Sequence, residues 1–194
     1  MGWTPGVHLT DRGEEQAERL VERLAPVTLT AIYSSPLERC VETARPVATT
    51  RGLEVRLARE LGEVDYGAWT GRSLAQLSRT SLWRAVQVAP SSVRFPGGEA
   101  LSEAQLRAVD IVREIAAAHR RGAVAIVSHA DVIRLVLAHL AGVHLDLFQR
   151  FVVAPVSVTA VALGDGIPRV LKVNDTGGLA DLAPRRARRR KVGT

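Results

Sequence analysis

The first third of the chain alternates between apolar patterns of helical spacing and short apolar runs. A helical stripe predicts a first helix that starts at Thr10 and stops before Pro26. The apolar run over 29–35 predicts a strand. A second helix is predicted over 35–52, with Ser35 placed to cap it. This region therefore has the order helix, strand, helix.

The remaining two thirds continue the same alternation. In chain order the pattern predicts a short strand and loop over 53–72, a helix over 73–89, a loop over 89–100, a helix over 101–122, a strand over 123–129, a helix over 130–143 and two strands over 151–175. The Gly-Asp-Gly run at 164–166 indicates a hairpin between the last two strands. Alternating strands and helices predict an α/β three-layer sandwich with a mostly parallel central sheet and an antiparallel edge strand.

Charge divides the chain into a neutral body and a basic tail. The chain has 194 residues and a net charge of +6, from 26 basic and 20 acidic residues. Six of the basic residues stand in the run RRARRRK, 185–191, which leaves the body balanced. We expect one domain over 1–182 and a basic, disordered tail over 183–194. The tail predicts at most weak, non-specific nucleic-acid contact through 185–191, because interleaved aromatic residues and paired zinc ligands are absent from the sequence.

Cysteine content and hydropathy exclude several classes of protein. The single cysteine, Cys40, excludes an internal disulfide and a multi-thiolate metal site, and its helical context favours a packing role. The longest apolar run, 151–163, is too short to cross a membrane and contains a proline. The first residues do not form a secretory leader. We therefore expect a cytoplasmic protein without membrane contact.

Polar residues gather where two predicted strands end. Arg39 falls in the first turn of the helix after the first strand, and His129 follows the strand 123–127 directly. The backbone N–H groups of Ala130 and Asp131 open the next helix. A guanidinium, an imidazole and a helix N-terminus at the carboxyl ends of parallel strands predict a site for a phosphate-like anion.

Glu63 adds a possible proton donor to this site. It lies in a loop with Tyr66 and Trp69, where partial desolvation would raise the pKa of its carboxyl group. Structural interpretations stand beside these: Arg39 as a surface ion-pair partner of Glu42, His129 as a core histidine with its hydrogen bonds satisfied, and Glu63 as merely exposed.

Four ordered motifs carry a family resemblance. SSPLERCVETA, LGEVDYGAWTG, FPGGEA and VSHADVI, in this order and at these separations, resemble the histidine phosphatase superfamily, with its phosphoglycerate mutase-like fold. The opening GWTPGVHLTDRGEEQA resembles the first loop and helix of that family, so the resemblance spans residues 2–178. It implies hydrolysis or transfer of the phosphate of a small phosphomonoester through a phosphohistidine, with no metal and no cofactor.

The resemblance also implies a role for individual residues. Arg39 would bind phosphate, His129 would be the second active-site histidine, and Glu63 would protonate the leaving oxygen. Fixed cationic donors of this kind stabilise the charge on the transferred phosphoryl group. The backbone of Ala130 would approach the phosphate. Ser35 would contact the substrate.

The matching segments depart from the family pattern at two positions. Ala130 stands where the family usually has glycine, and the added Cβ predicts weaker activity. Ala100 replaces the usual serine after Gly-Gly-Glu, which affects the loop that faces the substrate. Glu99 in this loop is expected either to contact the substrate or to anchor the loop. Asp65 is a second possible acid.

The family nucleophile has no counterpart in this sequence. In the family it belongs to an Arg-His-Gly motif that ends the first strand, and none of the five histidines stands in such a motif: His8, His119, His129, His139 and His144. The resemblance implies that the first central strand is missing too, and we expect its place to be between the strands that end at Ser35 and Ser128.

Three hypotheses follow from the missing nucleophile. The preferred one is an internal or mispredicted start, so that a longer form of the protein is an ordinary phosphatase or phosphomutase and the chain as written is inactive. The second is a non-catalytic relative that binds a phosphorylated ligand through Arg39 and His129. The third, nucleic-acid association through the basic tail, is the weakest. The sequence does not determine the substrate or the oligomeric state.

Overall fold

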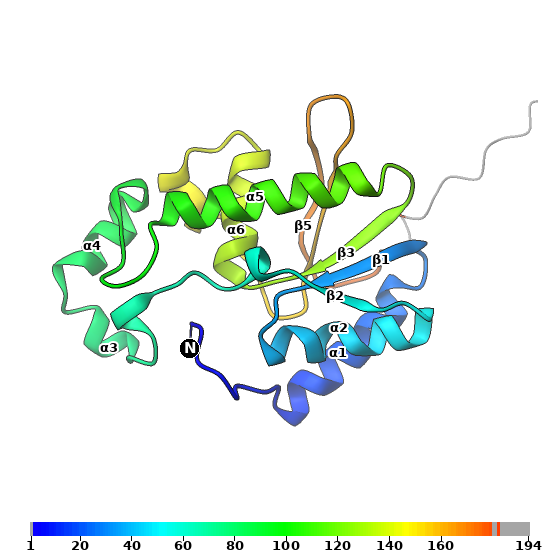
Figure 1. The fold of residues 1–194 in the computed structure, drawn as a ribbon, viewed down its shortest axis with the longest axis horizontal. Coiled ribbons are helices and arrows are strands. Elements are labelled where there is room, and N and C mark those ends of the chain that lie inside the picture. The colour runs from blue at the N-terminus through cyan, green and yellow to red at the C-terminus, as the bar shows by residue number, and fades with distance from the viewer. Residues whose placement is uncertain (1, 180–181, 183–194) are drawn as a thin grey trace, which may run out of the picture.

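Five strands and six helices make up the part of the chain that the computed structural model describes, residues 2–179 and 182 (Figure 1). The strands are β1 (Leu29–Ser34), β2 (Val55–Leu57), β3 (Ala123–Val127), β4 (Val158–Ala162) and β5 (Arg169–Asp175). The helices are α1 (Asp11–Leu24), α2 (Glu38–Arg51), α3 (Leu74–Leu77), α4 (Ser81–Val88), α5 (Leu101–Ala118) and α6 (Ala130–Leu140). Short 3₁₀ turns stand between them: η1 (Arg59–Leu61), η2 (Gly67–Trp69), η3 (Pro90–Ser92) and η4 (Leu145–Arg150).

The strands form two sheets. β1 lies in the middle of a three-stranded sheet of order β2, β1, β3, and both of its pairings are parallel. β4 and β5 form a separate antiparallel hairpin on either side of the Gly-Asp-Gly turn. The predicted parallel sheet and antiparallel hairpin are therefore both confirmed, with the hairpin standing as its own sheet.

Helices cover both faces of the parallel sheet. On one face, α1 and α2 enclose a core that includes Leu20, Val47 and Ile32 of β1. On the other face, α5 packs through Ile115 against the side chains of Tyr33 and other alternate strand residues. Helix α6 packs on α5 over a second core. This arrangement is the predicted three-layer sandwich.

Two local predictions are wrong, and side-chain hydroxyl groups explain both. The helix expected over 73–89 is broken into α3 and α4, because the Thr80 hydroxyl donates to the Leu77 carbonyl at 2.7 Å and accepts from the Trp83 amide at 3.3 Å. It thus terminates one helix and caps the next. Ser35 does not occupy the N-cap of α2; Leu37 does, without a side-chain cap. Just ahead of the helix, the Ser35 hydroxyl accepts from the Leu37 amide at 3.3 Å and lies 2.8 Å from His129 Nε2.

The place expected for a missing strand is also wrong. β1 and β3 are direct neighbours, paired from Leu29 with Ala123 to Ser34 with Val127. The Ser35 amide continues this pairing by donating to the Val127 carbonyl at 2.9 Å. The backbone of β1 is therefore bonded on both sides, and no slot separates the two strands.

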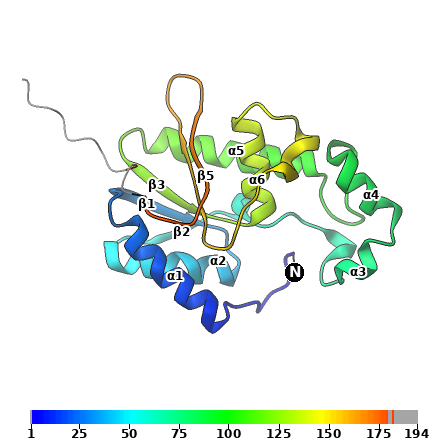
Figure 2. The same ribbon diagram turned by 180° about the vertical axis from the view of Figure 1, so that it is seen from behind.

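One edge of β3 has no strand partner among the described residues. All five residues of β3 and all five of β4 are partly exposed, whereas Ala31 and Ile32 of β1 are fully buried. Seen from behind, the hairpin passes beside β3 (Figure 2), and Val158 shares a core cluster with Ala125. The two sheets thus pack against one core without joining into a single sheet.

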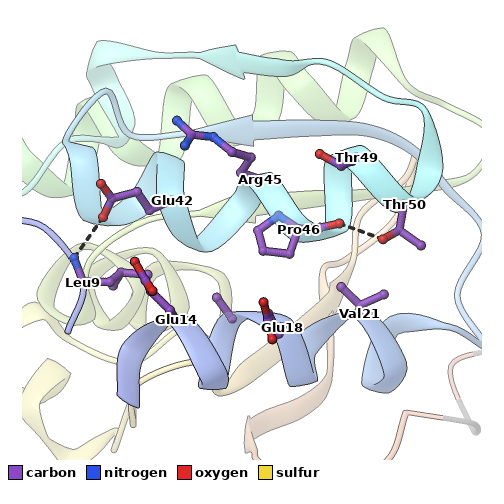
Figure 3. Close-up of a pocket in the computed structure, with 10 residues that line it drawn as sticks. Leu9, Glu14, Glu18, Val21, Glu42, Arg45, Pro46, Thr49 and Thr50 are labelled. Carbon is purple, nitrogen blue, oxygen red and sulfur yellow. Dashed lines mark hydrogen bonds between the residues drawn. The ribbon is translucent and has the colours of Figure 1, made fainter. Parts of the chain in front are cut away.

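A groove of about 500 Å³ runs between helices α1 and α2 (Figure 3). Ten residues line it: Leu9, Glu14, Ala17, Glu18, Val21, Glu42, Arg45, Pro46, Thr49 and Thr50. None of the predicted site residues belongs to this set, so the groove is separate from the predicted chemistry.

The basic run 185–191 lies outside the described residues, as does the rest of the predicted tail 183–194. Within residues 2–179 and 182, no helix is long and apolar enough to span a bilayer.

Candidate active site

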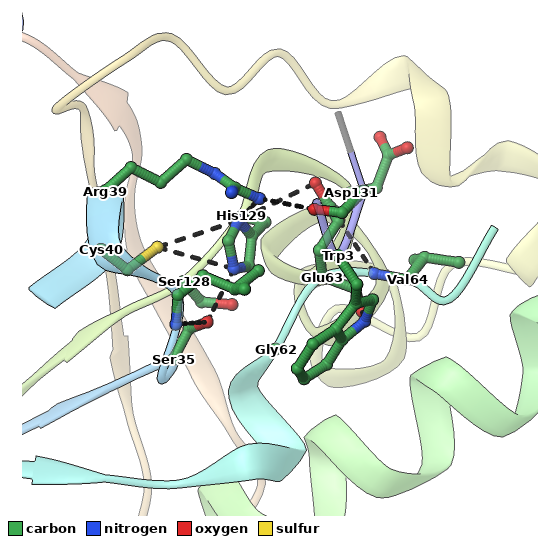
Figure 4. Close-up of polar contacts among 12 residues, drawn as sticks. Trp3, Ser35, Arg39, Cys40, Gly62, Glu63, Val64, Ser128, His129 and Asp131 are labelled. Carbon is green, nitrogen blue, oxygen red and sulfur yellow. Dashed lines mark hydrogen bonds and ion pairs between the residues drawn. The ribbon is translucent and has the colours of Figure 1, made fainter. Parts of the chain in front are cut away.

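His129 and Arg39 meet at the carboxyl ends of β3 and β1 (Figure 4). His129 is the N-cap residue of α6 and is 6% exposed, while Arg39 lies in the first turn of α2. Arg39 Nη2 donates to His129 Nδ1 at 3.2 Å. The two residues are 90 positions apart in sequence, and the direct pairing of β1 with β3 brings them together.

His129 is a neutral imidazole in this environment. Burial, followed by the positive charges of Arg39 and Arg107, lowers the pKa of His129 to about 3. Because an arginine only donates, Nδ1 accepts from Arg39, and the ring proton therefore sits on Nε2. Nε2 lies 2.8 Å from Ser35 Oγ and donates to it. Both ring nitrogens thus have partners.

Glu63 stands against the same imidazole. Its Oε2 lies 3.8 Å from His129 Nδ1, and its side chain is 15% exposed. Since His129 is neutral, this approach is a contact and not an ion pair. Burial, followed by the negative charge of Asp131, raises the pKa of Glu63 to about 7. The exposed alternative for Glu63 is therefore wrong, and its carboxyl group exchanges a proton near neutral pH.

Arg39 has donor capacity to spare. Nη2 also donates to the Gly2 carbonyl at 3.0 Å, and Nη1 is buried and has no hydrogen-bond partner among the described residues. The surface ion pair considered for this residue does not form, because Glu42 binds His8 and the Leu9 amide instead. Arg39 can therefore donate to an oxyanion, from Nη1 directly and from Nη2 once the Gly2 carbonyl is displaced.

Three further residues of the site have simpler surroundings. Ser35 is fully buried and accepts hydrogen bonds from His129 and from the Leu37 amide. Cys40 packs beside the imidazole, with Sγ 3.6 Å from Nε2, and burial raises the pKa of its thiol to about 12. Such a thiol is a packing group and not a nucleophile. Ala130, partly exposed, is the first residue of α6.

Glu99 anchors the loop that carries Glu63. Its carboxylate accepts two hydrogen bonds from Arg107, at 2.9 and 2.6 Å, and one from the Asp65 amide at 2.8 Å. Arg107 also donates to the carbonyls of Glu60, Gly62 and Glu63. The exposed Asp65 accepts from the Gly67 amide within the loop. Of the two roles considered for Glu99, these contacts are those of the anchor.

Sequence reasoning missed Arg107 and the first residues of the chain. Arg107 stands between Ala104 and Ile111, on the apolar stripe of α5, and a charge on such a stripe signals a buried partner. Trp3 donates from Nε1 to the Glu63 carbonyl at 2.6 Å and stacks beneath the Arg59 guanidinium. Nothing in the local pattern around Trp3 predicts this long-range contact.

The raised pKa of Glu63 predicts a pH-dependent gain in stability for Glu63→Gln. The folded pKa lies above the unfolded value of 4.5, so the stabilisation from the protonated group is complete below pH 4.5 and is lost as pH rises through 7. Glutamine does not titrate. We expect the difference in unfolding free energy, variant minus native chain, to rise by about 2–3 kcal/mol between about pH 5 and pH 8.

Urea unfolding at several pH values measures this difference. Glu54→Gln, a change at an exposed position before β2, is the matched control. Its unfolding free energy should differ from that of the native chain by the same amount at every pH. Parallel curves for Glu63→Gln and the native chain would contradict the buried, protonated carboxyl.

Within the described residues, no group of three His, Cys, Asp or Glu side chains is arranged to hold a metal ion. The cations of the site are arginines.

Comparison with known proteins gives a consistent result. The family model of the histidine phosphatase superfamily (branch 1) matches residues 1–176. Phosphoserine phosphatase 1 of Hydrogenobacter thermophilus is 31% identical over 175 residues, which cover 89% of this chain and 83% of that protein. Phosphoglycerate mutase-like protein 4 of Arabidopsis thaliana is 34% identical over 133 residues, covering 66% of this chain and 58% of that protein.

Solved structures show the same fold. YhfR of Bacillus stearothermophilus superposes with a TM-score of 0.85 at 28% identity, covering 91% of this chain and 89% of that one. The alpha-ribazole phosphatase of Shigella flexneri superposes with a TM-score of 0.78 at 27% identity, covering 90% of this chain and 87% of that one.

Proposed function

Because this chain belongs to the histidine phosphatase superfamily (branch 1), we propose that its Arg39, His129 and Glu63 form a binding site for a small phosphomonoester. The observation that carries the proposal is the convergence of these three side chains, from three separate segments, at the carboxyl ends of β1 and β3. Ligands of open α/β sheets bind at this edge.

Arg39 is the phosphate ligand in this proposal. The vacant Nη1 and the Nη2 that now holds the Gly2 carbonyl present two parallel donors to two phosphate oxygens. The N-terminus of α6, at Ala130, adds backbone donors and the positive end of the helix dipole. A phosphate dianion beside His129 also favours protonation of the imidazole, which then donates to a phosphate oxygen.

Glu63 is the proton donor in this proposal. With a pKa of about 7, a large fraction of the carboxyl groups carries a proton at neutral pH. Its Oε2 lies close enough to His129 for both side chains to reach one bound phosphomonoester. In the bound ester, this proton lets Glu63 donate a hydrogen bond to the ester oxygen.

The nucleophile is absent from the proposed set. None of the five histidines stands in an Arg-His-Gly motif. His8 is exposed and paired with Glu42, His119 contacts the Tyr33 hydroxyl, His139 contacts Arg113, and His144 caps η4. His129 has both ring nitrogens engaged. We therefore propose that the 194-residue chain binds phosphomonoesters without hydrolysing them.

Calorimetry on the full chain tests the proposed ligand class. The name of the Hydrogenobacter relative makes O-phospho-L-serine the first ester to try, and the mutase-like Arabidopsis relative suggests 3-phosphoglycerate as the second. Both should bind with one site per chain, while serine and glycerate should not. Absence of heat and of a thermal shift with all phosphorylated compounds and with inorganic phosphate would overturn the proposal.

A further inference from the structure

Residues 2–9 form a strap between the site and the start of helix α1. Near its beginning, the Gly2 carbonyl accepts from Arg39 Nη2 at 3.0 Å. Further along, the Gly6 and Leu9 amides donate to glutamate side chains of α2, at 3.1 and 2.9 Å. The strap is therefore attached at both ends, and its first attachment uses a donor of the proposed phosphate ligand.

Trp3 holds the first end of the strap on the loop of Glu63. Its indole Nε1 donates to the Glu63 carbonyl at 2.6 Å, and the Arg59 guanidinium lies over its ring, 4.7 Å from the centroid. Figure 4 shows the indole beside Gly62 and Glu63. A Cβ atom on Gly62 would come within 2.3 Å of this ring, so the glycine leaves the space that the indole fills. Glu63, Arg59 and Gly62 thus form a socket for the Trp3 side chain.

Gly2 has the conformation that its contact with Arg39 requires. It is buried, and its φ of +53° lies in the left-handed region that favours glycine. A Cβ atom there would lie 2.9 Å from Thr70 Oγ1 and 3.2 Å from the Tyr66 ring. The backbone of the strap can therefore pack this closely against the site because the residue has no side chain.

The strap and a bound anion need the same amine of Arg39. Nη2 donates to His129 Nδ1 and to the Gly2 carbonyl, so both of its hydrogens are used. A phosphate oxygen on Nη2 must therefore take the place of the Gly2 carbonyl. Displacing that carbonyl also means moving Trp3, which stands next to it in the chain, out of its socket.

We propose that the strap is an autoinhibitory contact, in which Trp3 in its socket holds the Gly2 carbonyl on Arg39 until a phosphate-like anion displaces it. This inference rests on the proposed function, because it concerns the access of the anion to Arg39. The attachments of the strap to α2 involve glutamates and not Arg39, so they remain in place when residues 2–4 move. The apparent affinity of the site is then reduced by the fraction of chains in which the strap is closed.

Trp3→Ala tests the inference, because it removes the hold on the strap and leaves the side chains of Arg39, His129 and Glu63 intact. Calorimetry with inorganic phosphate on the full chain should show binding tighter by about fivefold or more, since an indole hydrogen bond and a cation–π contact no longer stabilise the closed strap. Leu74→Ala, a truncation of an exposed apolar side chain on α3, is the control and should leave the affinity unchanged.

Arg59→Gln tests the same hold from the side of the socket. Removing a cation near an anion site by itself weakens binding, whereas loss of the contact with the indole should tighten it by about twofold. Arg72→Gln, at another exposed arginine of this region, is the matched control and should not tighten binding. Thermal unfolding verifies the fold of each variant, and Arg59→Gln decides the question if Trp3→Ala does not fold.

Fluorine NMR of the chain labelled with fluorotryptophan follows the movement itself. The sequence has three tryptophans, Trp3, Trp69 and Trp83, and the resonance that Trp3→Phe removes belongs to Trp3. Saturation with phosphate should shift this resonance, because the indole leaves its socket. A resonance that stays unchanged at saturation would overturn the inference.

The outcomes separate the two proposals. If neither the native chain nor Trp3→Ala binds phosphate, the proposed function is overturned. If both bind with the same affinity, or Trp3→Ala binds more weakly, the strap does not inhibit and this inference alone fails. Tighter binding by Trp3→Ala, together with the shift of the Trp3 resonance in the native chain, supports it.

Discussion

Replacing Arg39 with alanine is expected to weaken the binding of phosphate and phosphomonoesters by at least about 100-fold. Each charge-assisted hydrogen bond contributes about 1.5–3 kcal/mol, and Arg39 offers two donors to the anion. The only partner that Nη2 must release besides His129 is the Gly2 carbonyl, a neutral acceptor that a dianion displaces readily.

Arg39→Lys and Arg45→Ala make the result specific. Lysine keeps the charge but loses the paired donors, so binding should fall to an intermediate value. Arg45 lies on the same helix, lining the groove between α1 and α2, and its loss should have little effect. Thermal unfolding of each variant verifies the fold. Binding by Arg39→Ala within about threefold of the native chain would contradict the assignment of the phosphate ligand.

The native chain is expected to release phosphate from O-phospho-L-serine at least about 10⁴-fold more slowly than phosphoserine phosphatase 1 of Hydrogenobacter thermophilus assayed in parallel. Covalent catalysis needs an activated nucleophile, and the one buried histidine of the site donates to Ser35 and accepts from Arg39. Burial, followed by the charge of Arg39, lowers the pKa of that imidazole, which makes Nδ1 a weak nucleophile as well.

Radiolabelled phosphoserine and an acid-lability assay complete this experiment. No acid-labile label should remain on the native chain, and His129→Asn should behave identically. Label on the native chain that is absent from His129→Asn would contradict the supporting role of His129 and make it the nucleophile. Turnover without that label would place the nucleophile elsewhere.

Helices, strands and the hairpin with strong local signals were predictable from the sequence, and the neighbour order of strands in the parallel sheet was not. The buried run of β3 and the Gly-Asp-Gly turn identify their elements through periodicity and turn chemistry alone. Strand order depends on contacts between residues about 90 positions apart, so the direct neighbours β1 and β3 were wrongly expected to be separated. The helix predicted over 73–89 is divided at Thr80, because its hydroxyl donates to a carbonyl at the end of α3 and accepts from an amide at the start of α4.

The candidate site was predictable for the residues that directly follow a predicted strand. Arg39 and His129 stand directly after strands, and the carboxyl ends of parallel strands converge. Arg107, Tyr66 and Asp131 act through hydrogen bonds to other loops, and such contacts leave no local periodicity. For that reason the contacts that hold the Glu63 loop in place emerged only with the structure.

The free edge of β3 has a consequence for local opening of the site. Alternate amides of a parallel strand point to opposite edges, so β1 is protected on both sides over residues 32–34, where β2 and β3 both pair with it. Among the described residues, every second amide of β3 points toward an edge without a strand partner, and we expect these amides to exchange their hydrogens without the sheet breaking. The strand that supports His129 thus has a sheet partner on one side, and we expect the floor of the site to open at a lower free energy than the neighbouring β1.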